Sequence, residues 1–232
     1  MERRKFTSAL ICVTGSGALA LLPIAGRAAS LTQADAASGM RAALERGVDV
    51  AVQVLGRTDG FLGNPAVRIP LPGFLEDAAK LLKFTGQQRR IDELVTAMNR
   101  AAEAAVPEAR TLLVGAVRSM SVSDARRIVT GGDDSATAFF AEKTRSPLTA
   151  RFMPIVRRAT EKVALADKYN AIAGRAAGLG LLGKEEANLQ RYVTAKALDG
   201  LYRMIAEEER KIRRDPVSTG SAILAKVFGA RR

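Results

Sequence analysis

The chain has 232 residues, of which 36 are Lys or Arg and 24 are Asp or Glu, so its formal net charge is +12 at pH 7. It contains 0 His and 1 Cys, which excludes His-dependent catalytic triads, His-ligated metal sites, Cys-rich zinc sites and an intramolecular disulfide. Aromatic residues make up 5% and Trp is absent, so the core must rely on Leu, Val, Ile and Ala.

The first 29 residues predict a cleaved signal peptide. They open on Arg3, Arg4 and Lys5, continue as an apolar run through Leu22, and end in a tract of small residues, which is the order of a secretory signal. The small residues favour cleavage near Ala28. Two arginines followed by Lys and Phe also fit the twin-arginine pattern, so general secretion and twin-arginine export both stay open. Either route predicts a periplasmic protein.

Beyond this segment, apolar residues recur at the spacing of amphipathic helices nearly to the end of the chain. No run of alternating β-branched residues is long enough to seed a sheet. The predicted helices, in chain order, cover residues 40–55, 75–82, 91–105, 109–120, 124–130, 134–140, 148–165, 185–212 and 221–228.

The residues between these apolar segments are typical of helix starts and helix ends. Pro107 either kinks one helix or starts a new one. A Gly131-Gly132 pair stops a helix, and Asp133 or Asp134 caps the next. No linker is long enough to divide domains. We therefore predict one all-α domain over residues 30–232, a single compact multi-helix bundle with one Pro-rich extended loop.

That loop covers residues 59–73 and holds the first candidate ligand-binding residues, Asn64 and Arg68. Three prolines restrict its backbone, so a rigid loop could present both side chains to a carboxylate or phosphate. The alternative is a structural strap, in which the apolar residues dock on the bundle and Arg68 faces solvent. The sequence favours the strap.

Two further groups of candidates lie downstream. Asp133 and Asp134 could bind a hard cation, although their spacing does not match an EF-hand and a helix start explains them as well. Lys168, Tyr169 and Asn170 resemble acid/base groups by residue type, and they could instead fix a ligand headgroup. No Gly-rich nucleotide loop follows a strand, so we expect no cofactor, and we assign no metal ligand and no catalytic residue.

Five blocks of the sequence resemble an exported bacterial family known as domain of unknown function family 4197. The resemblance covers essentially the whole mature chain and implies export and a helical fold, but no activity. The blocks are residues 59–72 (DGFLGNPAVRIPLP), 98–103 (MNRAAE), 130–134 (TGGDD), 168–170 (KYN) and 206–209 (AEEE).

Together these features predict a periplasmic binding protein for an anionic amphiphile, such as a lipid, or for an acidic component of the cell envelope. An amphipathic C-terminal helix over residues 221–228 would allow peripheral membrane contact. Nucleic acid is not expected, because too few aromatic residues interleave with the basic ones. Two alternatives stay open: an envelope enzyme that uses Asp, Lys or Tyr chemistry, and a purely structural interaction module. The sequence predicts no oligomeric state.

Overall fold

The computed structural model describes residues 33–75, 88–180, 182–183 and 185–215. Contacts separate residues 1–30 from residues 31–232, and the first unit, with the predicted signal peptide, lies outside the described residues. The described part of the second unit consists of helices, turns and irregular chain, with no strand. Its elements are α1 (Gln33–Gly56), η1 (Gly73–Leu75), α3 (Gln88–Ala105), η2 (Val106–Glu108), α4 (Ala109–Arg118), α5 (Val122–Thr130), α6 (Ser135–Thr160), α7 (Ala164–Gly178) and α8 (Leu189–Arg214), where η marks a 3₁₀ helix.

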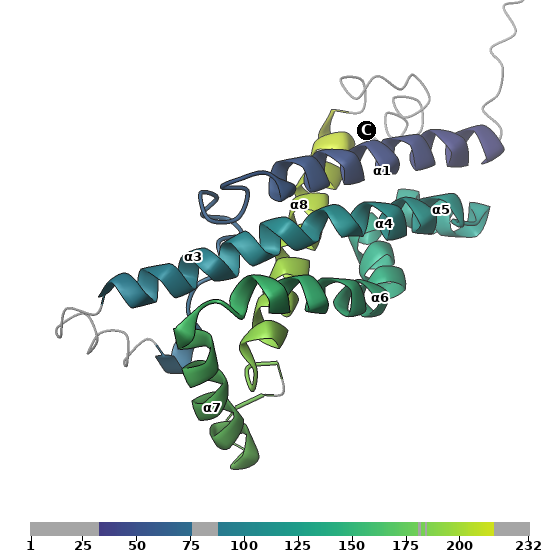
Figure 1. Cartoon of the computed structure of the whole chain (residues 1–232). Coiled ribbons are helices and arrows are strands. Elements are labelled where there is room, and N and C mark those ends of the chain that lie inside the picture. The colour runs from purple at the N-terminus through teal and green to yellow at the C-terminus, as the bar shows by residue number, and fades with distance from the viewer. Residues whose placement is uncertain (1–32, 76–87, 181, 184, 216–232) are drawn as a thin grey trace, which may run out of the picture. The chain divides into compact units, whose positions relative to one another are not determined.

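The helices pack as a bundle, which confirms the predicted all-α fold. In Figure 1, α1, the α3–α4 pair and α6 run side by side, and α8 crosses them. α8 contacts α1, α3, α6 and α7, and it is the element that joins the bundle. α7 contacts α3 and α8 at one end of this arrangement.

The core is mostly aliphatic, as the composition predicts. Ala, Leu, Val, Ile and Met side chains from α1, α3, α4, α6 and α8 form one continuous buried cluster. Three Phe side chains and one Tyr are nevertheless among the largest fully buried groups, namely Phe61, Phe140, Phe152 and Tyr169. Apolar side chains of this size bury much area each, so few aromatics suffice to fill the centre.

One prediction for a segment that contains proline is confirmed, and another is wrong. Pro107 lies in η2, which is one turn of 3₁₀ helix, and α-helix continues on both sides, as predicted. The two helices predicted over residues 134–140 and 148–165 are wrong, because α6 runs unbroken past Pro147 and Pro154 and ends at Thr160. Both prolines are exposed and lie seven residues apart on one face, so water can satisfy the carbonyls that lose a helical partner.

Two predicted helices fall largely outside the described residues: residues 75–82, of which only the end of η1 is described, and residues 221–228. None of the helices in the described ranges is both long and apolar enough to cross a bilayer.

Candidate functional site

The Pro-rich segment is held by α3 through one buried amide. Asn99 Oδ1 accepts the backbone N–H of Ile69 at 2.8 Å, and Asn99 Nδ2 donates to the Ile69 carbonyl at 2.9 Å. Asn99 is fully buried, so its side chain replaces the pairing that a neighbouring strand would give to Ile69. Tyr192 of α8 donates its hydroxyl to the next carbonyl, that of Pro70, at 3.1 Å.

One helical turn further along α3, a buried carboxylate holds the start of the same segment. Glu103 Oε1 accepts the backbone N–H groups of Phe61 and Leu62 at 3.0 and 3.1 Å. Its other oxygen accepts Arg100 Nη1 at 2.6 Å, and Arg100 Nη2 reaches Asp59 Oδ1 at 2.8 Å. The Pro-rich segment is therefore held at residues 59–62 and again at residues 69–70.

This geometry is that of the structural strap. Val67 and Ile69 are buried in the core, and Leu71 packs against it, whereas Arg68 is exposed and pairs with no described residue. Asn64 Oδ1 accepts the backbone N–H of Ala66 at 3.1 Å, a local turn contact. Asn64 and Arg68 do not converge on a pocket among those that the described residues form.

The segment also explains a glycine in the middle of α8. A Cβ built on Gly200 would lie 2.7 Å from Phe61 Cε1 and 3.3 Å from Val67 Cβ. The Phe61 ring is fully buried and cannot move aside at low cost. The lack of a side chain at Gly200 therefore lets Phe61 and Val67 of the strap pack directly against α8.

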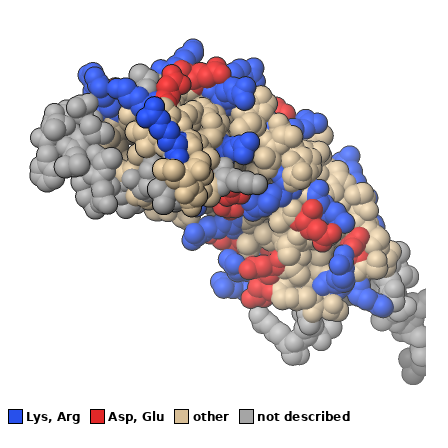
Figure 2. All heavy atoms as spheres, turned by 90° about the horizontal axis from the view of Figure 1, so that it is seen from below, with Lys and Arg blue, Asp and Glu red and all other residues tan. Residues whose placement is uncertain are grey.

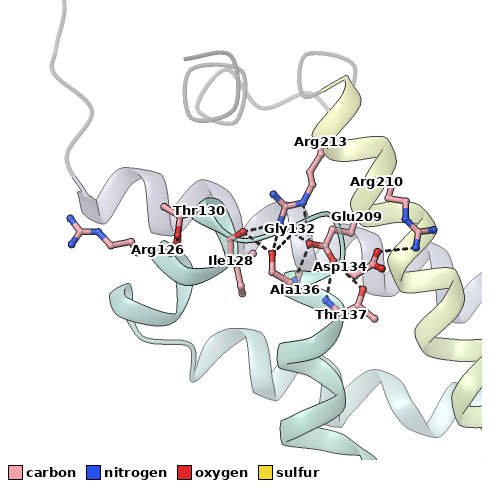
Figure 3. A network of polar contacts seen from close by, with 11 residues as sticks. Arg126, Ile128, Thr130, Gly132, Asp134, Ala136, Thr137, Glu209, Arg210 and Arg213 are labelled. Atoms are coloured by element: carbon pink, nitrogen blue, oxygen red, sulfur yellow. Dashed lines mark hydrogen bonds and ion pairs between the residues drawn. The ribbon is translucent and has the colours of Figure 1, made fainter. Parts of the chain in front are cut away.

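A second buried carboxylate closes the N-terminus of α6 (Figure 3). Glu209 of α8 accepts the backbone N–H of Ala136 through Oε1 and that of Thr137 through Oε2, both at 2.9 Å. The Thr137 hydroxyl adds a bond of 3.0 Å. The first turn of a helix has free N–H groups and a partial positive charge, so Glu209 satisfies both at once.

Arg213 completes this network one turn along α8. Its Nη2 donates to Glu209 Oε1, to the Ile128 carbonyl and to Ser135 Oγ, each at 2.7 Å (Figure 3). The side chains of Arg213 and Glu209 are only 10% and 4% exposed. The network joins the end of α5, the start of α6 and the end of α8.

The same network decides how the predicted aspartates are placed. Asp134 is the N-cap residue of α6, but its side chain makes no capping hydrogen bond, so the expectation of an Asp cap is wrong and Glu209 does this work. Asp134 instead pairs with Arg210 at 2.9 Å (Figure 3), and Asp133 is exposed. Among the described residues, no three acidic, His or Cys side chains gather where a metal ion could be held.

The three consecutive candidates of α7 do not share one environment. Lys168 is exposed, whereas Tyr169 is buried and donates its hydroxyl to the Glu186 carbonyl at 2.7 Å. Burial, with smaller contributions from Tyr192 and Glu186, raises the pKa of Tyr169 above its usual range. A phenol that is buried and committed to a carbonyl is a poor proton donor at neutral pH. Tyr169 is thus part of the core.

Asn170 is the predicted candidate that reaches a cleft. Its Oδ1 accepts the backbone N–H of Leu189 at 2.8 Å, and its Nδ2 donates to Gln190 Oε1 at 3.2 Å. Gln190 is buried and donates in turn to Thr160 Oγ1 at 3.1 Å. These amides tie α7 to the end of α6 and the start of α8, and they form a fixed polar floor.

The cleft above this floor has a volume of about 650 Å³. Three segments form it: the C-terminal end of α6, the first half of α7, and the turn that leads into α8. This volume is in the range of small-molecule sites. The lining residues are Met153, Arg157, Glu161, Asp167, Asn170, Ala187, Asn188, Gln190 and Arg191.

The cleft is lined by two arginines from different helices, Arg157 of α6 and Arg191 of α8. Arg157 and Arg191 are exposed and pair with no described carboxylate. Several other exposed arginines of the described residues reach an acid, such as Arg110 with Asp49 at 2.8 Å, and some, such as Arg68, do not. The cleft therefore offers two guanidinium groups whose donors are open to a ligand.

The sequence did not single out these two arginines. In the sequence they look like ordinary solvated charges, because each lies on a helix otherwise rich in Arg. Their shared position follows from the packing of α6 against α8. The one available signal was the amide pair Asn170 and Gln190, of which only Asn170 was predicted as a candidate.

The candidates for enzyme chemistry are not brought together. Asp134 lies beside Arg210 near the end of α8, whereas Tyr169 and Asn170 contact the residues that begin that helix. The helical rise between Leu189 and Arg210 is roughly 30 Å. The acid and the Lys-Tyr pair therefore share no reaction site.

The comparisons with known proteins give one match. A family model described as "Protein of unknown function (DUF4197)" matches residues 30–229, which confirms the resemblance seen in the five sequence blocks. No curated protein and no solved structure matches the chain. Two of those blocks, residues 130–134 and 206–209, meet in the network of Figure 3, and residues 59–72 and 98–103 meet at Asn99 and Glu103.

Proposed function

The chain belongs to the DUF4197 family of proteins of unknown function, and from its cleft we propose that it is a binding protein for an anionic ligand. The ligand places a phosphate or carboxylate against Arg157 and Arg191. The observation that carries the proposal is that both guanidinium groups line a cleft of about 650 Å³ without an ion-pair partner among the described residues. Planar guanidinium groups bind such anions through paired hydrogen bonds.

The polar floor supports the same function. Asn170 Nδ2 uses one hydrogen for Gln190, and an amide nitrogen carries a second. A ligand oxygen between the arginines and this amide would meet donors that are already fixed in place, which lowers the entropic cost of binding.

The lining also indicates which part of a ligand enters. Of the lining residues only Met153 and Ala187 are apolar, so the cleft suits a headgroup and not an acyl chain. Glu161 and Asp167 offset the charge of the arginines. A headgroup with a cationic group beside its phosphate therefore fits better than a polyanion. An anionic or zwitterionic lipid of the cell envelope has this chemistry, and export of the chain would bring the two together.

Isothermal titration calorimetry of the full chain tests the proposal, with phosphoethanolamine, glycerol phosphate and inorganic phosphate as probes. We expect Arg157→Gln and Arg191→Gln each to weaken binding of the best probe by about tenfold or more, since a charge-assisted hydrogen bond is lost. Arg151→Gln is the matched control, because Arg151 is an exposed arginine of α6 outside the cleft.

Glu161→Gln and Asp167→Asn separate two kinds of ligand. They should weaken the binding of phosphoethanolamine, which carries an amine, and strengthen the binding of glycerol phosphate, which does not. The proposal is overturned if none of the three probes binds, or if the two cleft arginine variants bind as tightly as the Arg151 control. Native mass spectrometry of the protein from its own cells would then identify the natural ligand.

A further inference from the structure

The outer face of α7 carries the most exposed large apolar side chains of the described residues. Leu179 is 76% exposed and Ile172 is 55% exposed. The backbone N–H of Leu179 donates to the Arg175 carbonyl, so Leu179 continues the helical register of α7. A spacing of seven residues places Ile172 and Leu179 on one face, two turns apart.

Basic residues alternate with these apolar ones along the same line. Lys168, Ile172, Arg175 and Leu179 follow one another at spacings of four, three and four residues, which is one side of an α-helix. Lys168 and Arg175 are exposed and pair with no described carboxylate. The opposite side holds the buried residues Ala166, Tyr169 and Ala173, through which α7 contacts the bundle.

We infer that this face of α7, formed by Lys168, Ile172, Arg175 and Leu179, docks on an anionic lipid bilayer. The inference goes beyond the proposed ligand cleft, which uses the side of α7 that carries Asn170. A helix with apolar and basic residues on its exposed face lies in the bilayer interface, with its apolar side chains below the headgroups. Lys and Arg reach up from that depth to the lipid phosphates.

The arrangement fits a bilayer better than a protein partner. Ile172 and Leu179 are separated by the charged Arg175, so they form no continuous apolar patch of the kind that protein interfaces bury at their centre. Lipid headgroups, by contrast, accept single apolar side chains between cations. Figure 2 views the molecule from the side on which α7 lies in Figure 1, and blue basic side chains lie there among tan ones and groups of red acidic ones. Without the predicted signal peptide, which holds four basic residues and one acidic residue, the net charge is +9, and this charge adds attraction to an anionic surface.

The absence of Trp from the chain allows a direct test. Ile172→Trp in the full chain places a single indole on the proposed face, and Val122→Trp places one on α5, where Val122 is 44% exposed. Vesicles of phosphatidylcholine with phosphatidylglycerol as the minor lipid should shift the Ile172→Trp emission to shorter wavelength, and brominated lipid should quench it. The Val122→Trp emission should stay unchanged. This readout is specific to α7 even if another part of the chain also binds the vesicles.

A charge variant gives the second measurement. Lys168→Gln with Arg175→Gln should weaken vesicle binding about tenfold, since each basic residue near an anionic surface contributes to it, whereas Arg126→Gln on α5 should not. The inference is overturned if the Ile172→Trp emission does not respond to anionic vesicles, if it responds equally to pure phosphatidylcholine, or if it shifts without lipid because the chain self-associates through α7. The cleft variants Arg157→Gln and Arg191→Gln keep this face intact, so failure here and failure of the proposed ligand site are distinguishable.

Discussion

Glu209 near the end of α8 accepts the backbone N–H of Ala136 in the first turn of α6 at 2.9 Å, across 73 positions of sequence. A carboxylate from a distant helix thus replaces the local cap that Asp134 does not provide. Arg213 pairs with that carboxylate in a site that is nearly closed to water. The junction between α5 and α6 depends on the end of α8 for its geometry.

We expect Glu209→Gln to lower the free energy of unfolding by about 2–4 kcal/mol, because it removes the negative charge beside the nearly buried Arg213 and one of the two oxygens that accept the α6 backbone N–H groups. Asp134→Asn is the matched control, since it removes an acid of the same network whose ion pair with Arg210 is 57% and 38% exposed. The control should change stability by less than about 0.5 kcal/mol. Urea denaturation measures both, and equal losses would contradict the assigned role of Glu209.

Gly200→Ala should destabilise the protein by about 1–3 kcal/mol, because the new methyl group meets the buried ring of Phe61. Gly115→Ala provides the opposite case within the same fold. Gly115 is an exposed residue of α4 with no atom within 4 Å of an added Cβ. There Ala should stabilise by about 0.5–1 kcal/mol. Thermal unfolding of the two variants should therefore move in opposite directions, and a stabilised Gly200→Ala variant would place the strap elsewhere.

Acid should weaken the start of α5. Hydrogen bonds from the Ser121 side chain and backbone, with a further contribution from Arg127, hold the pKa of Asp124 at about 2, below its ordinary value of 3.8. A folded-state pKa below the unfolded value means that ionised Asp124 stabilises the fold above about pH 4 and loses this contribution as pH falls through about 2. The melting temperatures of wild type and Asp124→Asn should thus differ at neutral pH and converge over this window. Glu93→Gln, which removes the exposed pair with Arg89, is the comparison.

Tyr169→Phe should cost about 1 kcal/mol of stability, because the Glu186 carbonyl loses its hydrogen bond from the Tyr169 hydroxyl. It should leave phosphate binding in the cleft unchanged, since Tyr169 does not line it. Calorimetry of folding and of binding on the same preparation separates the two effects. If Tyr169→Phe keeps its stability and loses phosphate binding, Tyr169 contributes to the binding site and the prediction is wrong.

No helix was predicted over most of α7 (Ala164–Gly178), and α6 was divided in two. Elsewhere local patterns predicted helices and their ends, because these depend on neighbouring residues. The stop at Gly131 and the turn at Pro107 are examples. The Pro-flanked apolar alternation at Val67, Ile69 and Leu71 likewise predicted a docked strap. The predicted break between residues 140 and 148 is wrong, since packing and not the neighbouring residues decides whether a long helix continues past an exposed proline such as Pro147.

The candidate site could be predicted only in part. Asn170 stood out as a polar residue within a recognisable block, and it does reach the cleft. Arg157 and Arg191 did not, because what distinguishes them is the lack of a partner after α6 and α8 have packed. Asn99 and Glu103 were visible only as members of a block, and their role depends on backbone groups that lie at least 30 positions away.

The position of α8 in the chain determines when the fold can close. This helix is the last described element, and it supplies contacts to α1, α3, α6 and α7. A nascent chain that has emerged only as far as α7 therefore carries apolar faces on α1 and α6 that nothing yet covers. Folding cannot be completed before Leu189–Arg214 is available, and these long-range contacts make the final step slower than the formation of the individual helices.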